Sequence, residues 1–296
     1  MKKTFICLFL TISFFSFPSF SNAVSSETYE KKKAGIYKNL NDVSISQQGH
    51  AVNTIQLLYN APYLEGADRE EVEAFRKTFQ TTRNKTLLKD ALENSLELRL
   101  YVRKAIQNAG LPPELEYLPV VESYYKTTAK SSSGALGLWQ FMANSVKPYL
   151  ELNDYVDERL DPWKETEAAL KKLKENYNMF GDWLLAIGAY NCGAGAMQRA
   201  LNKAEKKDFW FLAENKLIPL QTIQYVPKLL AIADLVMHSD FYEMDIPLHQ
   251  DEYNGLYNET NGIFEYVCVK NAYSLKTLAQ EMRIDYDILK KLNPSF

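Results

Sequence analysis

Regularly spaced apolar residues predict a long helical region in the first half of the chain. From Asp68 onward they recur at steps of three and four residues, which places their side chains on one face of an α-helix. The series comprises Val72, Phe75, Phe79, Leu87, Leu88, Ala91, Leu92, Leu96, Leu100 and Ile106. Gly110 closes this run and Pro112-Pro113 opens the next one. The fold is therefore expected to be mainly α.

One carboxylate directly follows an apolar run in the next segment. A helix from about Pro113 is expected to deliver Glu122 at or near its C-terminal end. Residues 129–142, which come next, are rich in small residues and include a Trp, an amide and a Met. Such surroundings disfavour the charged form of a carboxylate and raise its pKa. Glu122 is therefore a candidate general acid for protonating a glycosidic oxygen.

Two other acids on the same helix are rivals for this role. Glu114 lies in the first turn, where the helix dipole favours an acid without any catalytic function. Glu116 flanks the apolar stripe, so its expected environment is ambiguous. The residue types alone leave the choice among the three acids open.

Five short motifs follow one another in an order typical of one enzyme family. They are Glu122-Ser123, Ala129-Lys130-Ser131, the segment Gly134 to Met142, the segment Ala189 to Gly195, and Tyr225-Val226-Pro227. The series resembles the family 1 lytic transglycosylases, which are peptidoglycan lyases with a goose-lysozyme-like fold. Asp157-Glu158-Arg159, Asp161-Pro162 and Phe180-Gly181-Asp182-Trp183 also resemble its membrane-bound D subgroup. The resemblance spans roughly residues 72–235.

The resemblance implies a lysozyme-like catalytic domain that acts on peptidoglycan glycan strands. Glu122 would protonate the oxygen of the β-1,4 bond between N-acetylmuramic acid (MurNAc) and N-acetylglucosamine (GlcNAc). As a carboxylate it would then take the proton of the C6 hydroxyl, which closes onto C1 to give a 1,6-anhydroMurNAc end without consuming water. The residues that would hold the sugars or the catalytic Glu are Ser123, Ser131, Gln140, Met142, Tyr190, Asn191 and Tyr225.

Several residues in the Gly-rich segment have two interpretations. Gly134 and Gly137 fit the wall of a saccharide cleft, because a missing side chain lets a sugar come close. Trp139 and Phe141 suit either an apolar face for a sugar ring or the hydrophobic core. Met142 is equally suited to filling the core. Tight packing between helices is the expected reason for Gly188.

A helix break is expected at Tyr190-Asn191, between a helix from about Asp182 and another from about Ala194. A tyrosine hydroxyl and an asparagine amide at such a break can bind an N-acetyl group or hold a carboxylate. The alternative is that Asn191 caps the second helix.

The motifs supply only one convincing carboxylate. Asp157, Glu158 and Asp161 surround Arg159, and they predict an ion-pair network that orients a loop. Retaining and inverting glycosidases usually need two carboxylates flanking the bond. A lyase needs one, because the C6 hydroxyl of the substrate is the nucleophile. The alternatives are a muramidase-type hydrolase and an inactive cell-wall glycan-binding protein.

Two positions depart from the family pattern. Ala143 follows Met142 where most members have Pro, and Gln221-Thr222 stands where many carry Glu-Thr. The second change replaces a carboxylate near the sugar site with an amide, so a different subsite preference or rate is expected.

The first residues predict export. Lys2 and Lys3 form a positive n-region, residues 5–20 are an apolar stretch broken by Pro18, and Ser21-Asn22-Ala23 offers a cleavage site. The stretch is shorter than the roughly 20 residues that span a bilayer, which favours a signal peptide over an anchor helix. The protein is expected in the periplasm or cell envelope of a bacterium, where it can associate with the cell-wall or outer-membrane surface.

Composition excludes other function classes. The formal net charge is −3, and the chain lacks the basic stripe of a nucleic-acid binder. His50, His238 and His249 have no metal-ligand spacing, so neither a metal nor a cofactor is expected. Cys192 and Cys268 are more consistent with two unpaired small residues, while a disulfide between them is the alternative that an exported protein permits. No feature of the sequence indicates an oligomeric state.

The chain divides into five expected segments. These are a signal peptide (1–23), an N-terminal helical extension (24–95), the lysozyme-like domain (96–236), a connector (237–265) and a small α+β segment (266–296). The last resembles the β-α-α beginning of a LysM glycan-binding module, with Leu292-Asn293-Pro294 as its most recognisable part, although the closing strand is absent. Glycan binding and plain packing are equally compatible with it.

Overall fold

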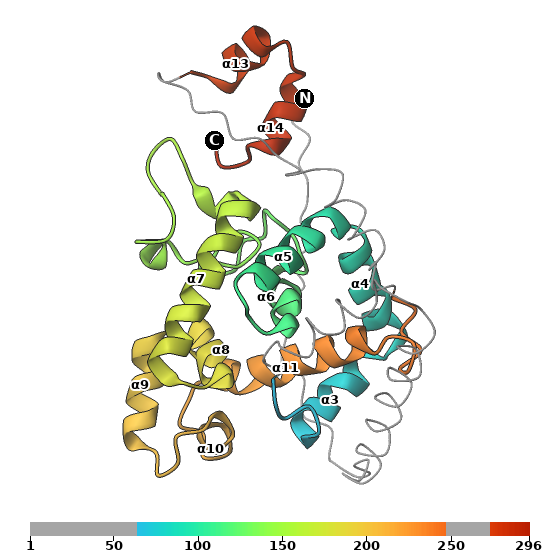
Figure 1. Cartoon of the computed structure of the whole chain (residues 1–296), viewed down its shortest axis with the longest axis vertical. Coiled ribbons are helices and arrows are strands. Elements are labelled where there is room, and N and C mark those ends of the chain that lie inside the picture. Colours follow the sequence, from blue (N-terminus) through green and yellow to red (C-terminus); the bar gives the residue numbers. More distant parts are fainter. Residues whose placement is uncertain (1–63, 247–272) are drawn as a thin grey trace. The chain divides into compact units, whose positions relative to one another are not determined.

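The structure is a computed structural model, which describes residues 64–246 and 273–296 (Figure 1). Within these ranges every regular element is a helix, as expected for a mainly α fold. None of the helices in these ranges combines the length and the apolar character needed to span a membrane. The expected signal peptide, most of the connector, and Cys268 lie outside the described residues. The segment boundaries stay predictions.

The predicted N-terminal helical region consists of three helices. They are α3 (Glu70–Phe79), α4 (Thr82–Glu93) and α5 (Leu96–Asn108). The apolar spacing correctly predicted the buried faces, since Val72, Leu88 and Leu100 are fully buried, whereas Leu87 is exposed. The short breaks between the three helices do not change the spacing of the apolar residues. The sequence therefore predicted one continuous helical region and did not locate these breaks.

The segment that carries Glu122 is built from two short helices instead of one. A 3₁₀-helix, η1 (Pro113–Tyr117), leads into α6 (Leu118–Ser123). Pro119 has no N–H group for an α-helical bond to Leu115, so the chain cannot continue one regular helix through this point. Tyr124, with φ 52°, ends α6 in the left-handed region. Glu122 lies in the last turn of α6, as predicted.

Three further helices pack on one another in series, and the last of them contacts α6. The longest, α7 (Pro162–Phe180), begins at the N-cap Asp161 and ends at Gly181. It packs on α8 (Trp183–Cys192), which is buried from Leu184 to Tyr190. Helix α11 (Leu220–Met237) contacts α3, α6, α8 and η1 (Figure 1). Helices α6, α8 and α11 therefore bring three distant parts of the sequence together.

Two short helices, α9 (Ala194–Lys203) and α10 (Phe209–Glu214), complete this part of the chain. The break between α8 and α9 falls at Gly193, beyond the predicted Tyr190-Asn191, whereas the two helices begin close to the predicted Asp182 and Ala194. Gly188 also has the predicted packing role, because an added Cβ would lie 2.8 Å from Met197 Cε and 3.2 Å from the Phe209 ring.

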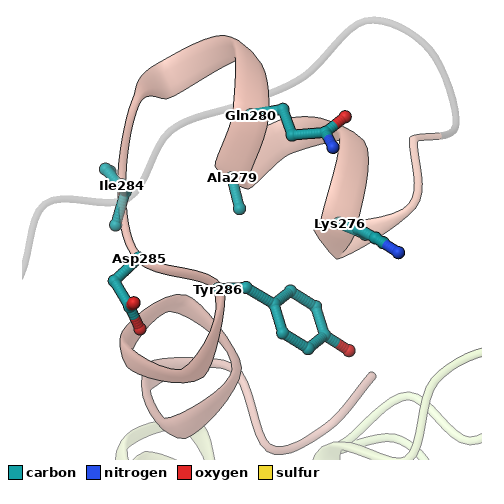
Figure 2. A pocket seen from close by; sticks show the side chains of 6 residues that line it. All are labelled: Lys276, Ala279, Gln280, Ile284, Asp285 and Tyr286. Carbon is teal, nitrogen blue, oxygen red and sulfur yellow. The ribbon is translucent and has the colours of Figure 1, made fainter.

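The C-terminal segment contains α13 (Leu275–Met282) and α14 (Tyr286–Leu292). Ser274 caps α13 by accepting the Thr277 N–H at 3.1 Å. Arg283, with φ 56°, turns the chain between the two helices. A pocket between them is lined by Lys276, Ala279, Gln280, Ile284, Asp285 and Tyr286 (Figure 2). The expected strand near Val267 lies outside the described residues, so the LysM-like character stays a prediction.

Candidate active site

Glu122 is half-buried in the last turn of α6, which packs on α11, and α11 in turn packs on α8. Burial raises its pKa to about 7, although a hydrogen bond from Tyr225 and the positive charges of Lys172 and Lys228 act in the opposite direction. The Tyr225 hydroxyl donates that short hydrogen bond to Glu122 Oε1. A carboxyl group with this pKa can give up and take back a proton near neutral pH.

Two nearly buried tyrosines hold this site. Burial, followed by the charge of Glu122, raises the pKa of Tyr225 well above its ordinary value, so its hydroxyl remains a proton donor. Tyr190, on α8, donates to the Trp139 carbonyl oxygen at 2.9 Å. Its ring meets that of Phe141 edge-on, with centroids 6.2 Å apart. Tyr190 thus fixes the loop after α6 (residues 124–142), and Tyr225 fixes the Glu122 carboxyl group itself.

The serine next to the acid joins α6 to that loop. The Ser123 hydroxyl lies 2.8 Å from the Leu138 carbonyl oxygen and 3.1 Å from that of Pro119. The residue is buried. Ser123 therefore lies next to Glu122, and its hydroxyl is hydrogen-bonded to backbone carbonyl oxygens.

Gln140 and Ser131 shape the turns of the loop. Gln140 adopts a left-handed φ of 55°, and its amide nitrogen donates to the carbonyl oxygens of Gly137 at 2.8 Å and Ala129 at 3.0 Å. The Ser131 hydroxyl accepts the Ala135 N–H at 2.9 Å. These two predicted sugar-binding residues keep the loop in one conformation.

Aromatic and sulfur side chains of the loop separate into two groups. Trp139 is fully buried and Phe141 is 2% exposed, so both belong to the core and present no face to a sugar. Trp139 also donates its indole N–H to Thr166 Oγ1 at 2.9 Å. Met142 is half-buried and lies outside the buried core. Of these three residues, only Met142 is open to a ligand.

Asn191 lies inside α8, and Gly193 is the N-cap of α9, so the capping interpretation is wrong. The Asn191 side-chain oxygen accepts the Thr222 hydroxyl at 2.9 Å. Because this bond fixes the orientation of the amide, its NH₂ group points away from Thr222. Within the described part of the chain, that NH₂ group has no hydrogen-bond partner and is a free donor for a carbonyl such as that of an N-acetyl group.

A further buried acid, Glu165, was not among the predicted site residues. It lies in the first turn of α7 and is fully buried. One of its oxygens accepts the Trp139 N–H at 3.0 Å, and the other has no partner among the described residues. Burial raises its pKa well above the ordinary range, and the charge of Glu122 adds to this. Glu165 lies three and four residues before Ala168 and Ala169, which are buried in the same helix. This helical spacing is the sequence pattern that would have predicted a buried position for Glu165.

The position of Glu165 explains why one of the two loop glycines, Gly137, cannot carry a side chain. Gly137 has φ +91°, and an added Cβ would lie 1.8 Å from the Arg159 carbonyl oxygen and 2.6 Å from Glu165 Oε2. Gly134 has φ +90°, but an added Cβ would meet nothing within 4 Å. Close packing against Glu165 thus requires Gly137, whereas Gly134 faces open space.

The rival acids have structural partners. Although burial opposes it, the positive charges of Arg103 and Arg99 lower the pKa of Glu116. The ion pairs measure 2.6 Å to Arg103 and 3.0 Å to Arg99. Burial raises the pKa of Glu114 to about 7, but this residue is only 6% exposed and accepts the Leu64 N–H at 3.0 Å. The two carboxyl groups have similar pKa values, so the greater exposure of Glu122 is what makes it the better candidate for the catalytic acid.

The predicted ion-pair network around Arg159 is confirmed for Asp157 alone among the three acids. Arg159 pairs with Asp157 at 2.7 Å, and Lys164 pairs with Glu158 at 2.5 Å. Asp161 instead caps α7 by accepting the backbone N–H groups of the next turn. Arg159 Nη1 also donates to the Gly134 carbonyl oxygen at 3.4 Å, so the network does orient the loop.

The unfolding temperature is expected to report the raised pKa of Glu122. Its ordinary value is 4.5 and its value in the folded protein is about 7, so folding favours the protonated form. The resulting stabilisation is complete below the ordinary pKa and is lost as the pH rises through the folded one. We expect thermal unfolding to show a smaller loss of stability over this pH range in Glu122→Gln than in the parent. Identical pH dependence would contradict the raised pKa.

Comparisons with known proteins agree with this geometry. Residues 100–212, which include Glu122 and Tyr190, match the Transglycosylase SLT domain. The chain is 36% identical over 171 residues to the membrane-bound lytic murein transglycosylase D of Escherichia coli strain K12, and equally to that of Escherichia coli O6:H1 strain CFT073. These alignments cover 56% of this chain and 37% of each relative. Residues 100–212 of this chain are thus similar to a transglycosylase SLT domain, and the chain spans little more than a third of the length of these relatives.

Proposed function

We propose that this protein cleaves the MurNAc-β-1,4-GlcNAc bond of peptidoglycan without hydrolysis, and that Glu122 acts first as the acid and then as the base. The observation that carries the proposal is the Glu122 carboxyl group, which has a pKa of about 7 and is held by Tyr225 within the region that matches the SLT domain. Because the alignments cover little more than a third of the relatives, the activity of the whole chain is inferred from this site.

The first step is protonation of the glycosidic oxygen. Neutral Glu122 gives its proton to the leaving GlcNAc, and positive charge develops at C1 of MurNAc. The carboxylate then removes the proton of the C6 hydroxyl, and O6 bonds to C1. The acid is regenerated, since one proton leaves and one returns. Because the Tyr225 hydroxyl occupies Oε1, Oε2 is the atom that exchanges protons with the substrate.

The buried position of Glu165 favours the lyase route over hydrolysis. A hydrolase of the usual kind needs a second carboxylate that reaches the sugar or a water molecule beside it. Glu165 is the other acid whose pKa is coupled to the charge of Glu122, and it is fully buried behind Trp139. It supports the loop and is out of reach of a glycan.

The released muropeptides are expected to be lighter by one water molecule than those made by a hydrolytic muramidase from the same sacculi. The ring closes onto C1 in place of water, so the product is the 1,6-anhydro sugar. Mass spectrometry of both digests measures the difference. Incorporation of oxygen from isotope-labelled water into the product would instead identify a hydrolase.

A further inference from the structure

We propose that Lys172 and Lys228 form an anion site beside Glu122 that binds a carboxylate of the glycan substrate. This inference rests on the proposed function, because it assigns a chemical group of the peptidoglycan to two residues of the same site. The carboxylate has two sources. A bare strand carries it on the lactyl group of MurNAc, and a peptide-bearing strand carries it on the stem.

The two lysines approach the site from opposite helices. Lys172 lies on α7 and Lys228 on α11, and both are half-buried. The Lys172 ammonium lies 5.0 Å from the ring centroid of Tyr190 and 5.2 Å from that of Phe141. Lys228 Nζ lies 5.8 Å from the ring centroid of Phe75. Each ammonium is thus held over aromatic rings, which attract a cation more weakly than a carboxylate does.

Within residues 64–246 and 273–296, neither ammonium forms an ion pair with a carboxylate, although Glu122 is close enough to affect both lysines. Burial lowers the pKa of each lysine, and the charge of Glu122 only partly offsets this. Half-buried cations that lack a partner are costly to the folded protein. Their cost is relieved when an anion binds between them and solvent.

The lysines also oppose the chemistry of the free site. Their positive charges lower the pKa of an acid that must be protonated to act. A substrate carboxylate bound to them would cancel this effect and raise the pKa of Glu122 on binding. The substrate would then help to protonate the group that cleaves it. The groups that bear on this balance are Lys172 and Glu165 of α7, Tyr190 of α8, and Tyr225 and Lys228 of α11.

Binding can be measured without turnover in the Glu122→Gln background. Calorimetric titration would compare soluble strands with free lactyl carboxylates, the same strands with those carboxylates converted to amides, and strands with peptide stems. We expect Lys172→Met and Lys228→Met each to weaken binding of the carboxylate-bearing strands by about tenfold, and to leave binding of the amidated strands unchanged. A loss confined to stem-bearing strands would place the carboxylate on the stem.

Lys171→Met is the matched control. Lys171 is the neighbour of Lys172 on α7, it is exposed, and its ammonium also lies over an aromatic ring, 5.8 Å from the centroid of Tyr149. Its charge is not among those that affect Glu122. Its replacement should leave all three affinities unchanged. Equal losses on amidated and carboxylate-bearing strands in the Lys172 and Lys228 variants would overturn the proposal.

Two further outcomes separate this inference from the proposed function. If Glu122→Gln binds none of the strands, the substrate class itself is wrong. If it binds free-carboxylate, amidated and stem-bearing strands equally well, the anion site is wrong while the function stands, and this comparison requires no lysine variant to fold. In the active enzyme, the lysine variants should also move the basic limb of kcat/KM to higher pH, because removing a positive charge raises the pKa of Glu122.

Discussion

Glu122→Gln is expected to abolish peptidoglycan cleavage while leaving folding and glycan affinity close to those of the parent. Glutamine keeps the size of the side chain and can still accept the hydrogen bond of Tyr225, but it cannot exchange a proton. Loss of general acid–base catalysis alone costs roughly 10²–10⁴-fold in rate. Clearance of purified sacculi measures the rate, and thermal unfolding shows that the variant is folded.

Glu114→Gln provides the control for this experiment. Burial raises the pKa of both carboxyl groups to about 7, so the two variants remove comparable titrating groups. Glu114 accepts the N–H of Leu64 and is buried, so its variant should cleave sacculi at nearly the parental rate. Parental activity in Glu122→Gln, or complete loss in Glu114→Gln, would mean that the wrong carboxyl group has been assigned.

The sequence predicted the parts of the fold and site that depend on local spacing. The three- and four-residue steps identified the buried faces of α3, α4 and α5, and the apolar run before Glu122 correctly predicted a desolvated acid. The start of α9 near Ala194 was also predicted, although α8 continues through Tyr190-Asn191, where the break was expected. In each of these cases, neighbours along the chain create the environment.

The overlooked residues depend on contacts between distant parts of the chain. Glu165 meets Trp139, Lys172 meets Tyr190, and Lys228 meets Phe75 only in the folded protein. On a helix, an acid in the first turn, such as Glu165, and a lysine among other lysines, such as Lys172, are typical of a solvated face. Only the packing of α7 on α8 and of α11 on α6 distinguishes these residues and Lys228 from ordinary charged residues.

The same packing makes Gly137→Ala the substitution with the largest expected effect on stability. An added Cβ would lie 1.8 Å from the Arg159 carbonyl oxygen and within 2.7 Å of both Glu165 carboxyl oxygens. Alanine would also be strained at φ +91°. Strain and overpacking each cost about 1–3 kcal/mol, so we expect a loss of roughly 2–5 kcal/mol in the free energy of unfolding. Denaturant unfolding measures it.

Gly134→Ala separates the two causes. Gly134 has nearly the same dihedral, φ +90°, but its added Cβ would meet nothing within 4 Å, so only the backbone strain applies. Its loss should stay at about 1–3 kcal/mol, and the loop should keep its place. Gly137→Ala must instead displace Glu165 or the backbone at Arg159, and either movement shifts the loop that Ser123 and Tyr190 fix beside Glu122. Cleavage should therefore fall sharply in Gly137→Ala and little in Gly134→Ala. Equal losses of stability and activity in the two variants would show that backbone strain, and not contact with the buried acid, fixes this loop.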